Sequence, residues 1–164
     1  MKHADMSYRI VPILAAIALS LGVLPPVYAK PIQIKVGMTS VIQSEKPKHA
    51  KHLAKLVDGL SQALQNLDYQ THVQPAPEDC TQLRCAKAAL KQGRFKMVVQ
   101  WKLQSQGLMG LGSHCRVGLT AYNPSGTAVL SDDITVSCRK AGMREALGFL
   151  TESLQSWHRE RRAA

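Results

Sequence analysis

The 164-residue sequence lacks the motifs by which most enzymes are recognised. Ser113 and His114 are neighbours, but no Gly-x-Ser-x-Gly sequence surrounds them, so no serine-hydrolase nucleophile is indicated. Asp132 and Asp133 are adjacent, and adjacent side chains of a strand point to opposite faces, so they are poorly placed to share acid-base work. A small secreted hydrolase or glycan-acting enzyme is therefore the alternative interpretation. A concave pocket containing two or more of His72, His114, Asp132 and Asp133 would favour it.

Acidic residues are also scarce. The chain has 21 Lys and Arg against 11 Asp and Glu, a formal charge of +10. Without Lys2, Arg9 and Asp5 of the N-terminal segment, 19 basic and 10 acidic side chains remain, or +9. A cytosolic protein of this charge would suggest nucleic acid. For an exported protein we expect an envelope protein, an anionic glycan or a lipid surface as the partner, and nucleic acid is disfavoured.

The sequence has no apolar run long enough to span a membrane. The longest, residues 10–24, has about fifteen residues, is interrupted by Pro12 and Ser20, and falls short of the roughly twenty that a spanning helix needs. Basic residues precede it and a Val27-Tyr28-Ala29 cleavage site follows. We expect residues 1–29 to be a cleaved signal peptide and residues 30–164 to form a single periplasmic or secreted domain, with no transmembrane span after cleavage.

The four cysteines, Cys80, Cys85, Cys115 and Cys138, include no Cys-x-x-Cys pair. An oxidising compartment favours disulfides, and four cysteines allow three pairings, of which we favour Cys80 with Cys85 and Cys115 with Cys138. No metal site or cofactor is indicated, because only His114 lies beside a cysteine.

A second candidate for metal binding is a histidine pair. His49 and His52 stand three apart on a predicted helix and could face one metal, but without a third ligand nearby we interpret them as solvated flank residues.

Alternation of apolar and polar side chains is the main signal for the fold. Residues 95–104 alternate, with Val98 as the one exception, and three segments have apolar residues three or four apart, as helices do. The pattern predicts an α+β fold, a two-layer sandwich with helices on one face of a mixed five-stranded sheet, in the order β-α-β-α-β-β-β-α. The predicted strands are residues 32–38, 69–74, 95–104, 115–122 and 128–136, and the predicted helices are about 44–67, 79–90 and 140–159.

The hairpin around residues 123–126 limits how Cys115 can reach Cys138. A simple register places Cys115 opposite Ile134, about four residues short of Cys138, so the favoured bridge requires a β-bulge. We predict it at Ser131–Asp133.

Two surfaces are candidates for partner binding. The polar side of the predicted sheet would be open to solvent and would present Lys35, Lys96, Lys102 and Arg116 in one field. The glycine-rich segment 107–113 carries three large apolar side chains that strand alternation does not explain: Leu108, Met109 and Leu111. They would form a contact site, and the alternative is that the loop folds back and buries them.

The element order, with a signal peptide, a cysteine-bearing short helix and two strands around the turn Tyr122-Asn123-Pro124-Ser125-Gly126, resembles small exported domains related to the N-terminal domain of TolB. The resemblance covers about residues 32–157. It implies a non-enzymatic binding or envelope-assembly module. The propeller that follows in TolB has no counterpart in this sequence, so neither partners nor site residues are carried over.

Overall fold

The computed structural model describes residues 33–44, 47–77, 79–105 and 112–163. The predicted signal peptide, residues 1–29, lies outside them. The elements follow in the order β1 (Ile34–Gln43), α2 (Pro47–Gln65), β2 (Tyr69–Val73), α3 (Leu83–Ala89), β3 (Phe95–Ser105), β4 (His114–Tyr122), β5 (Ala128–Ser137) and α4 (Lys140–Ala163).

The strands form one mixed sheet with the order β2-β1-β3-β4-β5. β1 is parallel to both β2 and β3, whereas β3, β4 and β5 are successive antiparallel neighbours. The five strands, the three helices and their order confirm the predicted α+β fold class. β3 lies at the centre, which agrees with the length of its alternating pattern.

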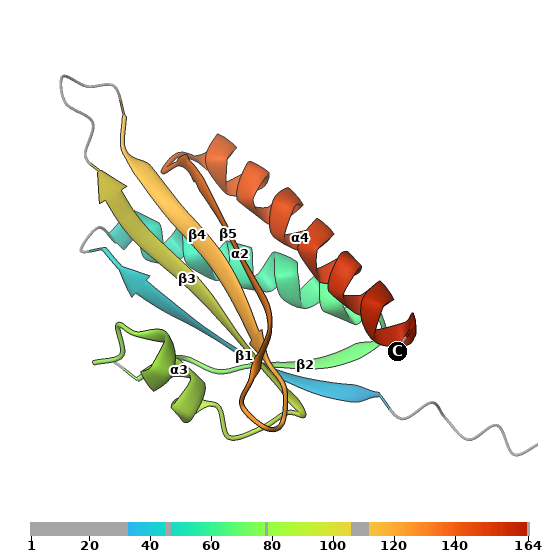
Figure 1. Cartoon of the computed structure of the whole chain (residues 1–164). Coiled ribbons are helices and arrows are strands. Elements are labelled where there is room, and N and C mark those ends of the chain that lie inside the picture. Colours follow the sequence, from blue (N-terminus) through green and yellow to red (C-terminus); the bar gives the residue numbers. More distant parts are fainter. Residues whose placement is uncertain (1–32, 45–46, 78, 106–111, 164) are drawn as a thin grey trace, which may run out of the picture. The chain divides into compact units, whose positions relative to one another are not determined.

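The main core lies between the sheet and the two long helices, α2 and α4 (Figure 1). We call the side of the sheet that they cover the first face. Trp101 of β3 packs there with Leu60 of α2 and Leu150 of α4, and all three are fully buried. The apolar stripes of the helices and the apolar side of the strands are thus covered together, as the periodicity predicts.

The short helix α3 lies on the opposite side, the second face, and this corrects the prediction that all helices share one face (Figure 1). Val41 of β1 and Val98 of β3 point to the second face, where they pack against Ala86 and Leu90. All four are almost completely buried. Val98 breaks the alternation because its side chain needs an apolar cover, and α3 provides it.

The β4–β5 hairpin contains the predicted bulge at another place. The pairing shifts near the turn, where Val129 is the extra residue on β5, and not at Ser131–Asp133. The shift brings Cys115 opposite Val136, two residues before Cys138. The structure contains the bridge between Cys115 and Cys138.

The second bridge, between Cys80 and Cys85, joins the segment before α3 to the first turn of that helix. A helix of seven residues is too short to be stable alone, because isolated helices below about 12–15 residues are marginal. α3 therefore depends on the bridge and on its packing against the sheet.

The first turn of α4 lies directly on the end of β5. Gly142 is buried, and a Cβ atom on it would stand 2.9 Å from the backbone nitrogen and the carbonyl carbon of Ser137 and closer still to the carbonyl oxygen. Gly148, six residues further along the same helix, faces open space. The helix therefore approaches the sheet at Gly142 as closely as only a glycine allows.

Candidate binding groove

A groove of about 340 Å³ crosses the second face beside α3. Gln100 of β3, with Gly118 and Thr120 of β4, lines its floor, Leu83 of α3 forms one side, and Ser131 of β5 lies on the other side. Apart from Leu83, these residues come from strands of one sheet, so their backbone positions are fixed by the strand pairing. A site on such a scaffold is preorganised.

Gly118 opens the middle of this groove. It pairs with Gln100 on one neighbouring strand and with Asp133 on the other, and it has no side chain to fill the space between them. A Cβ atom at Gly118 would lie 3.3 Å from the Cβ atom of Asp133. Glycine inside a strand often marks a close approach of a ligand or of another backbone. Gly118 is therefore a signal in the sequence that could have indicated a hollow at this place.

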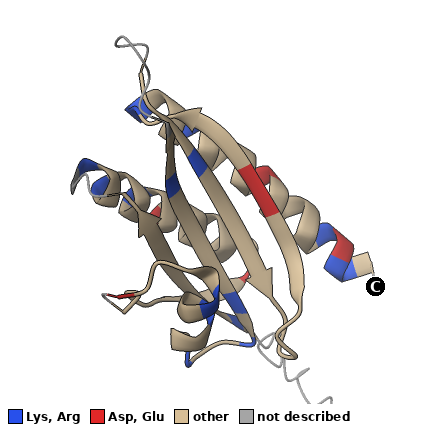
Figure 2. Cartoon of the chain, turned by 60° about the vertical axis from the view of Figure 1, so that its left-hand side comes forward, with Lys and Arg blue, Asp and Glu red and all other residues tan. Residues whose placement is uncertain are grey.

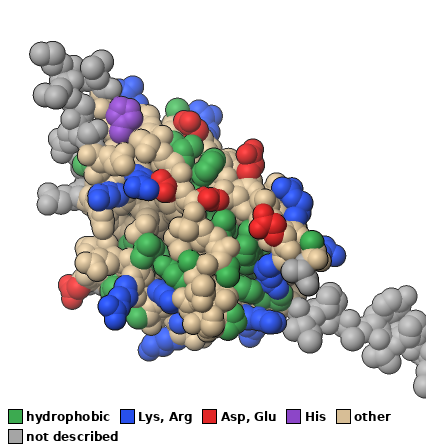
Figure 3. Space-filling model, viewed as in Figure 1, with side chains coloured by type: hydrophobic (Ala, Val, Ile, Leu, Met, Phe, Trp, Pro, Cys, Tyr) green, Lys and Arg blue, Asp and Glu red, His purple; other side chains and the backbone are tan. Residues whose placement is uncertain are grey.

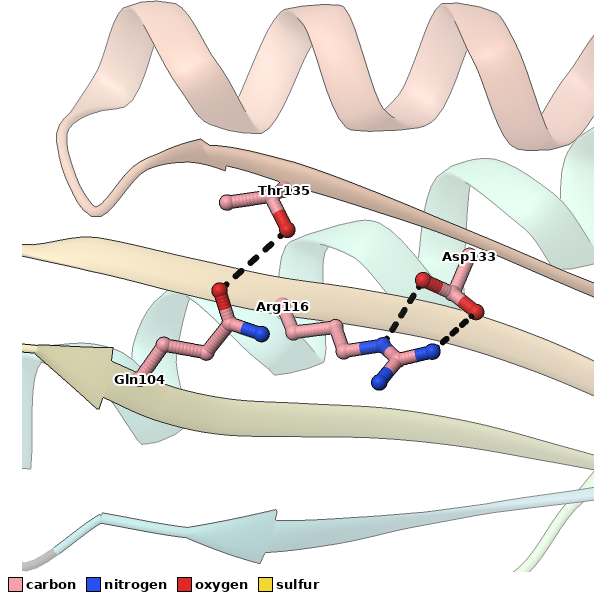
Figure 4. A network of polar contacts seen from close by, with 4 residues as sticks. All are labelled: Gln104, Arg116, Asp133 and Thr135. Carbon is pink, nitrogen blue, oxygen red and sulfur yellow. Dashed lines mark hydrogen bonds and ion pairs between the residues drawn. The ribbon is translucent and has the colours of Figure 1, made fainter.

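Arg116 and Asp133 form a bidentate pair at the edge of the groove (Figure 4). The Nε and NH2 groups of Arg116 donate to the two carboxylate oxygens of Asp133, each at 2.7 Å. These hydrogen bonds, with the positive charge of Arg116, hold the pKa of Asp133 below its usual value against the opposing effect of burial, and they raise the pKa of Arg116. The pair fixes the orientation of the guanidinium.

Two further hydrogen bonds order the polar side chains around that pair. The Thr135 hydroxyl on β5 donates to Gln104 Oε1 on β3 at 3.3 Å, which takes the Gln104 side chain across β4 (Figure 4). Gln43 Nε2 at the end of β1 donates to the carbonyl oxygen of Thr81 at 2.8 Å. This second bond ties the segment before α3 to the sheet.

The predicted basic residues fall into two separate pairs. Lys102 and Arg116 are direct cross-strand partners and both line the groove. Lys96 lies six residues before Lys102 on the same strand, roughly 20 Å away. Lys35 lies at the same end as Lys96, beside β2. The four cations therefore do not form one field, and their role in binding a partner stays a prediction.

Lys96 is also less accessible than expected. Its ammonium group lies 3.5 Å from the carbonyl oxygen of Lys87 in α3, and the side chain is half-buried. Lys87 itself lies over the ring of Tyr122, 4.4 Å from its centre. Figure 3 shows that the basic groups on this side are dispersed. α3 thus covers part of the face that was predicted to be open.

Both Asp132 and Asp133 line the groove, so the stated criterion for the enzyme alternative, a pocket with two or more of the four residues, is met. The strand register separates their side chains, however. Asp133 pairs with Gly118 on the groove side, whereas Asp132 pairs with Leu119, whose side chain belongs to the main core on the first face. The groove side therefore has one carboxylate from this pair, and Arg116 engages it. Figure 2 shows the acidic segment of β5 next to basic positions of the neighbouring strands.

His49 is buried, which corrects its interpretation as a solvated residue. Its ring lies 5.7 Å from that of Trp101, and its Nδ1 atom is 2.6 Å from the Ser44 hydroxyl. Its ligand atom and the sulfur atoms of Cys115 and Cys138 lie within 4.8 Å of one another. The two sulfurs are bonded to each other, and because thiolates are the form that binds metals, this group is not a metal centre as it stands.

The other predicted contact residues, Leu108, Met109 and Leu111, lie outside the described residues. Their role stays a prediction. None of the helices among the described residues has the length and hydrophobicity needed to cross a membrane.

No family model and no curated protein matches the chain. Among solved structures, lipoprotein GNA1162 from Neisseria meningitidis is similar with a TM-score of 0.45 and 10% identity, over 75% of this chain and 99% of that one. A neuraminyllactose-binding hemagglutinin homolog from Helicobacter pylori gives 0.42 and 12%, over 81% and 91%. The hypothetical protein CT253 from Chlamydia trachomatis gives 0.39 and 14%, over 80% and 94%. These TM-scores are too low for a function to follow, and the resemblance to TolB stays a prediction.

Proposed function

We propose that the chain is a non-enzymatic binding module of the cell envelope that holds an acidic glycan in the groove on the second face. The observation that carries the proposal is the arrangement of Lys102 and Arg116 at a hollow that Gly118 opens in the sheet. Sites for small ligands are concave and contain a few polar groups fixed in position.

The charges of the groove favour an acidic ligand. The side chains of Lys102 and Arg116 face it with the single carboxylate of Asp133, which leaves one positive charge in excess. Arg116 uses two of its five N–H donors on Asp133, so three are left for a ligand. A sugar carboxylate would accept hydrogen bonds from these donors and from Lys102.

The uncharged side chains suit the hydroxyl groups of a sugar. Gln100, Thr120 and Ser131 offer both donors and acceptors on the floor and side of the groove. Such a lining binds a polar ligand, whereas catalysis of glycan hydrolysis would need two carboxyl groups placed on either side of the bond. Among the described residues of the lining, only Asp133 points its carboxylate to the groove side, and Arg116 holds it, which supports binding over hydrolysis.

Binding of oligogalacturonate, a chain of acidic sugars, would test the proposal, with a neutral maltooligosaccharide of equal length as the reference ligand. Isothermal titration calorimetry should detect the acidic chain and not the neutral one, and added salt should weaken the binding. Lys102→Gln should weaken it by roughly tenfold, because a hydrogen bond to a charged group is lost. Gly118→Thr should block it by filling the hollow.

Lys35→Gln is the matched control, since Lys35 is equally exposed on the same side of the sheet but lies at the other end. It should bind like the unchanged protein. Equal weakening by Lys35→Gln and Lys102→Gln would contradict a site in the groove. Equal affinity for the neutral and the acidic chain would contradict the ligand class.

A further inference from the structure

A second hollow lies on the other side of the molecule, between α2 and α4. The two helices lie side by side over the first face, and both begin at the end of the sheet where β1 and β5 end (Figure 1). The hollow has a volume of about 290 Å³ and is formed by the first halves of both helices. It shares no lining residue with the groove on the second face.

The floor of this hollow is apolar. It is formed by Leu56 of α2 and by Met143 and Leu147 of α4. Leu147 also packs closely on Gly59, where a Cβ atom would lie 2.8 Å from a methyl carbon of Leu147. The helices therefore touch at Gly59, and the hollow ends at this contact.

The rim of the hollow is basic. His52 and Lys55 come from α2, and Lys140 and Arg144, one turn apart, come from α4. No carboxylate is among the described residues that line the hollow. Within the part of the chain that the structure describes, Lys55, Lys140 and Arg144 make no ion pair, since the one such pair is Arg116 with Asp133.

The first turns of α2 and α4 provide no acidic side chain to offset this positive charge. Neither α2 nor α4 has an acidic residue in its first turn, although acidic residues stabilise that position. Figure 2 shows basic residues near the start of both helices. No acidic side chain in the first turn of either helix therefore offsets the charge at the rim, and an anion bound there would be favoured.

We propose that this hollow binds a single-chain anionic amphiphile, such as a fatty acid. The acyl chain would lie on the floor formed by Leu56, Met143 and Leu147, and the carboxylate would lie between Lys55, Lys140 and Arg144. A volume of 290 Å³ is roughly ten times the ~30 Å³ that a water molecule occupies in the liquid, so the hollow has room for one short acyl chain. An amphipathic helical peptide needs a longer groove with anchors over several turns.

Laurate below its critical micelle concentration is the probe, added to the full protein and followed by isothermal titration calorimetry. Dodecyl maltoside, which has the same chain and a neutral headgroup, is the reference. Laurate should bind with one molecule per chain, and dodecyl maltoside should bind at least tenfold more weakly. A similar affinity for both would overturn the basic rim as the recognition element.

Two double variants separate the hollow from general charge effects. Lys140→Gln with Arg144→Gln removes two rim cations and should weaken laurate binding roughly tenfold or more. Arg159→Gln with Arg162→Gln makes the same change in net charge in the last turns of α4 and should leave the affinity unchanged. Equal weakening by both would overturn the proposal.

The remaining outcomes concern other occupants. A Leu147→Gln variant, checked by circular dichroism for an unchanged fold, should lose laurate binding because a polar group then lies in the floor. Absence of laurate binding, with association only to vesicles of anionic phospholipid, would show a membrane surface as the occupant and would overturn the proposal. Association only with an acidic amphipathic peptide would overturn it equally. None of these outcomes bears on the glycan groove, which lies on the other face.

Discussion

Replacing Gly142 by alanine should destabilise the protein, although the same change usually stabilises a helix. Alanine is favoured over glycine in a helix interior by roughly 1 kcal/mol. Gly142 lies in the first turn of α4, however, where a methyl group would stand 2.9 Å from two backbone atoms of Ser137 and closer to its carbonyl oxygen. Because the neighbour is backbone within β5, the strand or the helix must move to make room.

The size of the effect follows from these two opposing contributions. Overpacking a well-packed site costs about 1–3 kcal/mol and occasionally more. The cost at Gly142 should lie at the upper end of this range, because the strand backbone that it contacts is held by sheet pairing and by the nearby Cys138 bridge. Subtracting the gain in helix propensity leaves a net loss of about 2 kcal/mol, or a fall in melting temperature of roughly 5–10 °C for a domain of this size.

Gly148→Ala is the matched control, because Gly148 lies in the same helix with nothing within 4 Å of the added methyl group. It should raise the free energy of unfolding by about 0.5–1 kcal/mol. Both variants can be compared by differential scanning calorimetry and by urea unfolding followed by circular dichroism. If Gly142→Ala were as stable as Gly148→Ala, the close packing of α4 on β5 would be refuted.

Two further predictions concern the bridges and the groove. Paired serine substitutions that remove the bridge between Cys115 and Cys138 should lower the free energy of unfolding by about 3.5 kcal/mol, and those that remove the bridge between Cys80 and Cys85 by about 2 kcal/mol, because the first bridge closes the longer loop. Urea unfolding measures both losses, and a larger loss for the second bridge would contradict the chain-entropy reasoning. For Asp133, whose pKa is lowered in the folded state, the stabilisation is fully present above the ordinary value of 3.8 and is lost as the pH falls through the lower folded value. The difference in melting temperature between the native protein and Asp133→Asn should therefore be constant from neutral pH to about pH 4 and shrink below it. A difference that stayed constant down to pH 2 would contradict a stabilisation by the ionised Asp133 carboxylate.

Alternation in the sequence predicted the fold because it reports which side of each strand is buried. The alternating pattern around Trp101 identified the strand that forms β3 and its buried side, but not its central place in the sheet. It could not place α3, because a seven-residue helix has too few positions to show which face of a sheet it covers. Val98 contained that information, but a single valine on a polar face is also compatible with an exposed position.

The residues that line the candidate groove were predicted only in part. Lys102 and Arg116 were identified from their position on the polar side of the strands, and they do lie together. The pairing of Asp133 with Arg116 was not predicted, although the simple register with Cys115 opposite Ile134 would also have brought these two residues together. The bulge at Val129 places Asp133 opposite Gly118, so the pair is diagonal, and strand alternation alone does not show which side chains on one face engage each other. His49 was misjudged for a related reason: its burial depends on how α2 sits over Trp101, which periodicity does not fix.

The sheet order also bears on the sequence of events during folding. Of the five strands of this sheet the ribosome delivers β1 first, but β1 lies between β2 and β3, and β3 begins 52 residues after β1 ends. Strands β3, β4 and β5 are joined by hairpins and need only short loop closures, so they can pair early. The first strand synthesised should therefore be among the last to be fixed, and until then both its edges are open to pairing with other chains. Changes in β5, which pairs early, should therefore alter the folding rate more than changes in β1, whereas changes in β1 should mainly alter the unfolding rate and the tendency to aggregate.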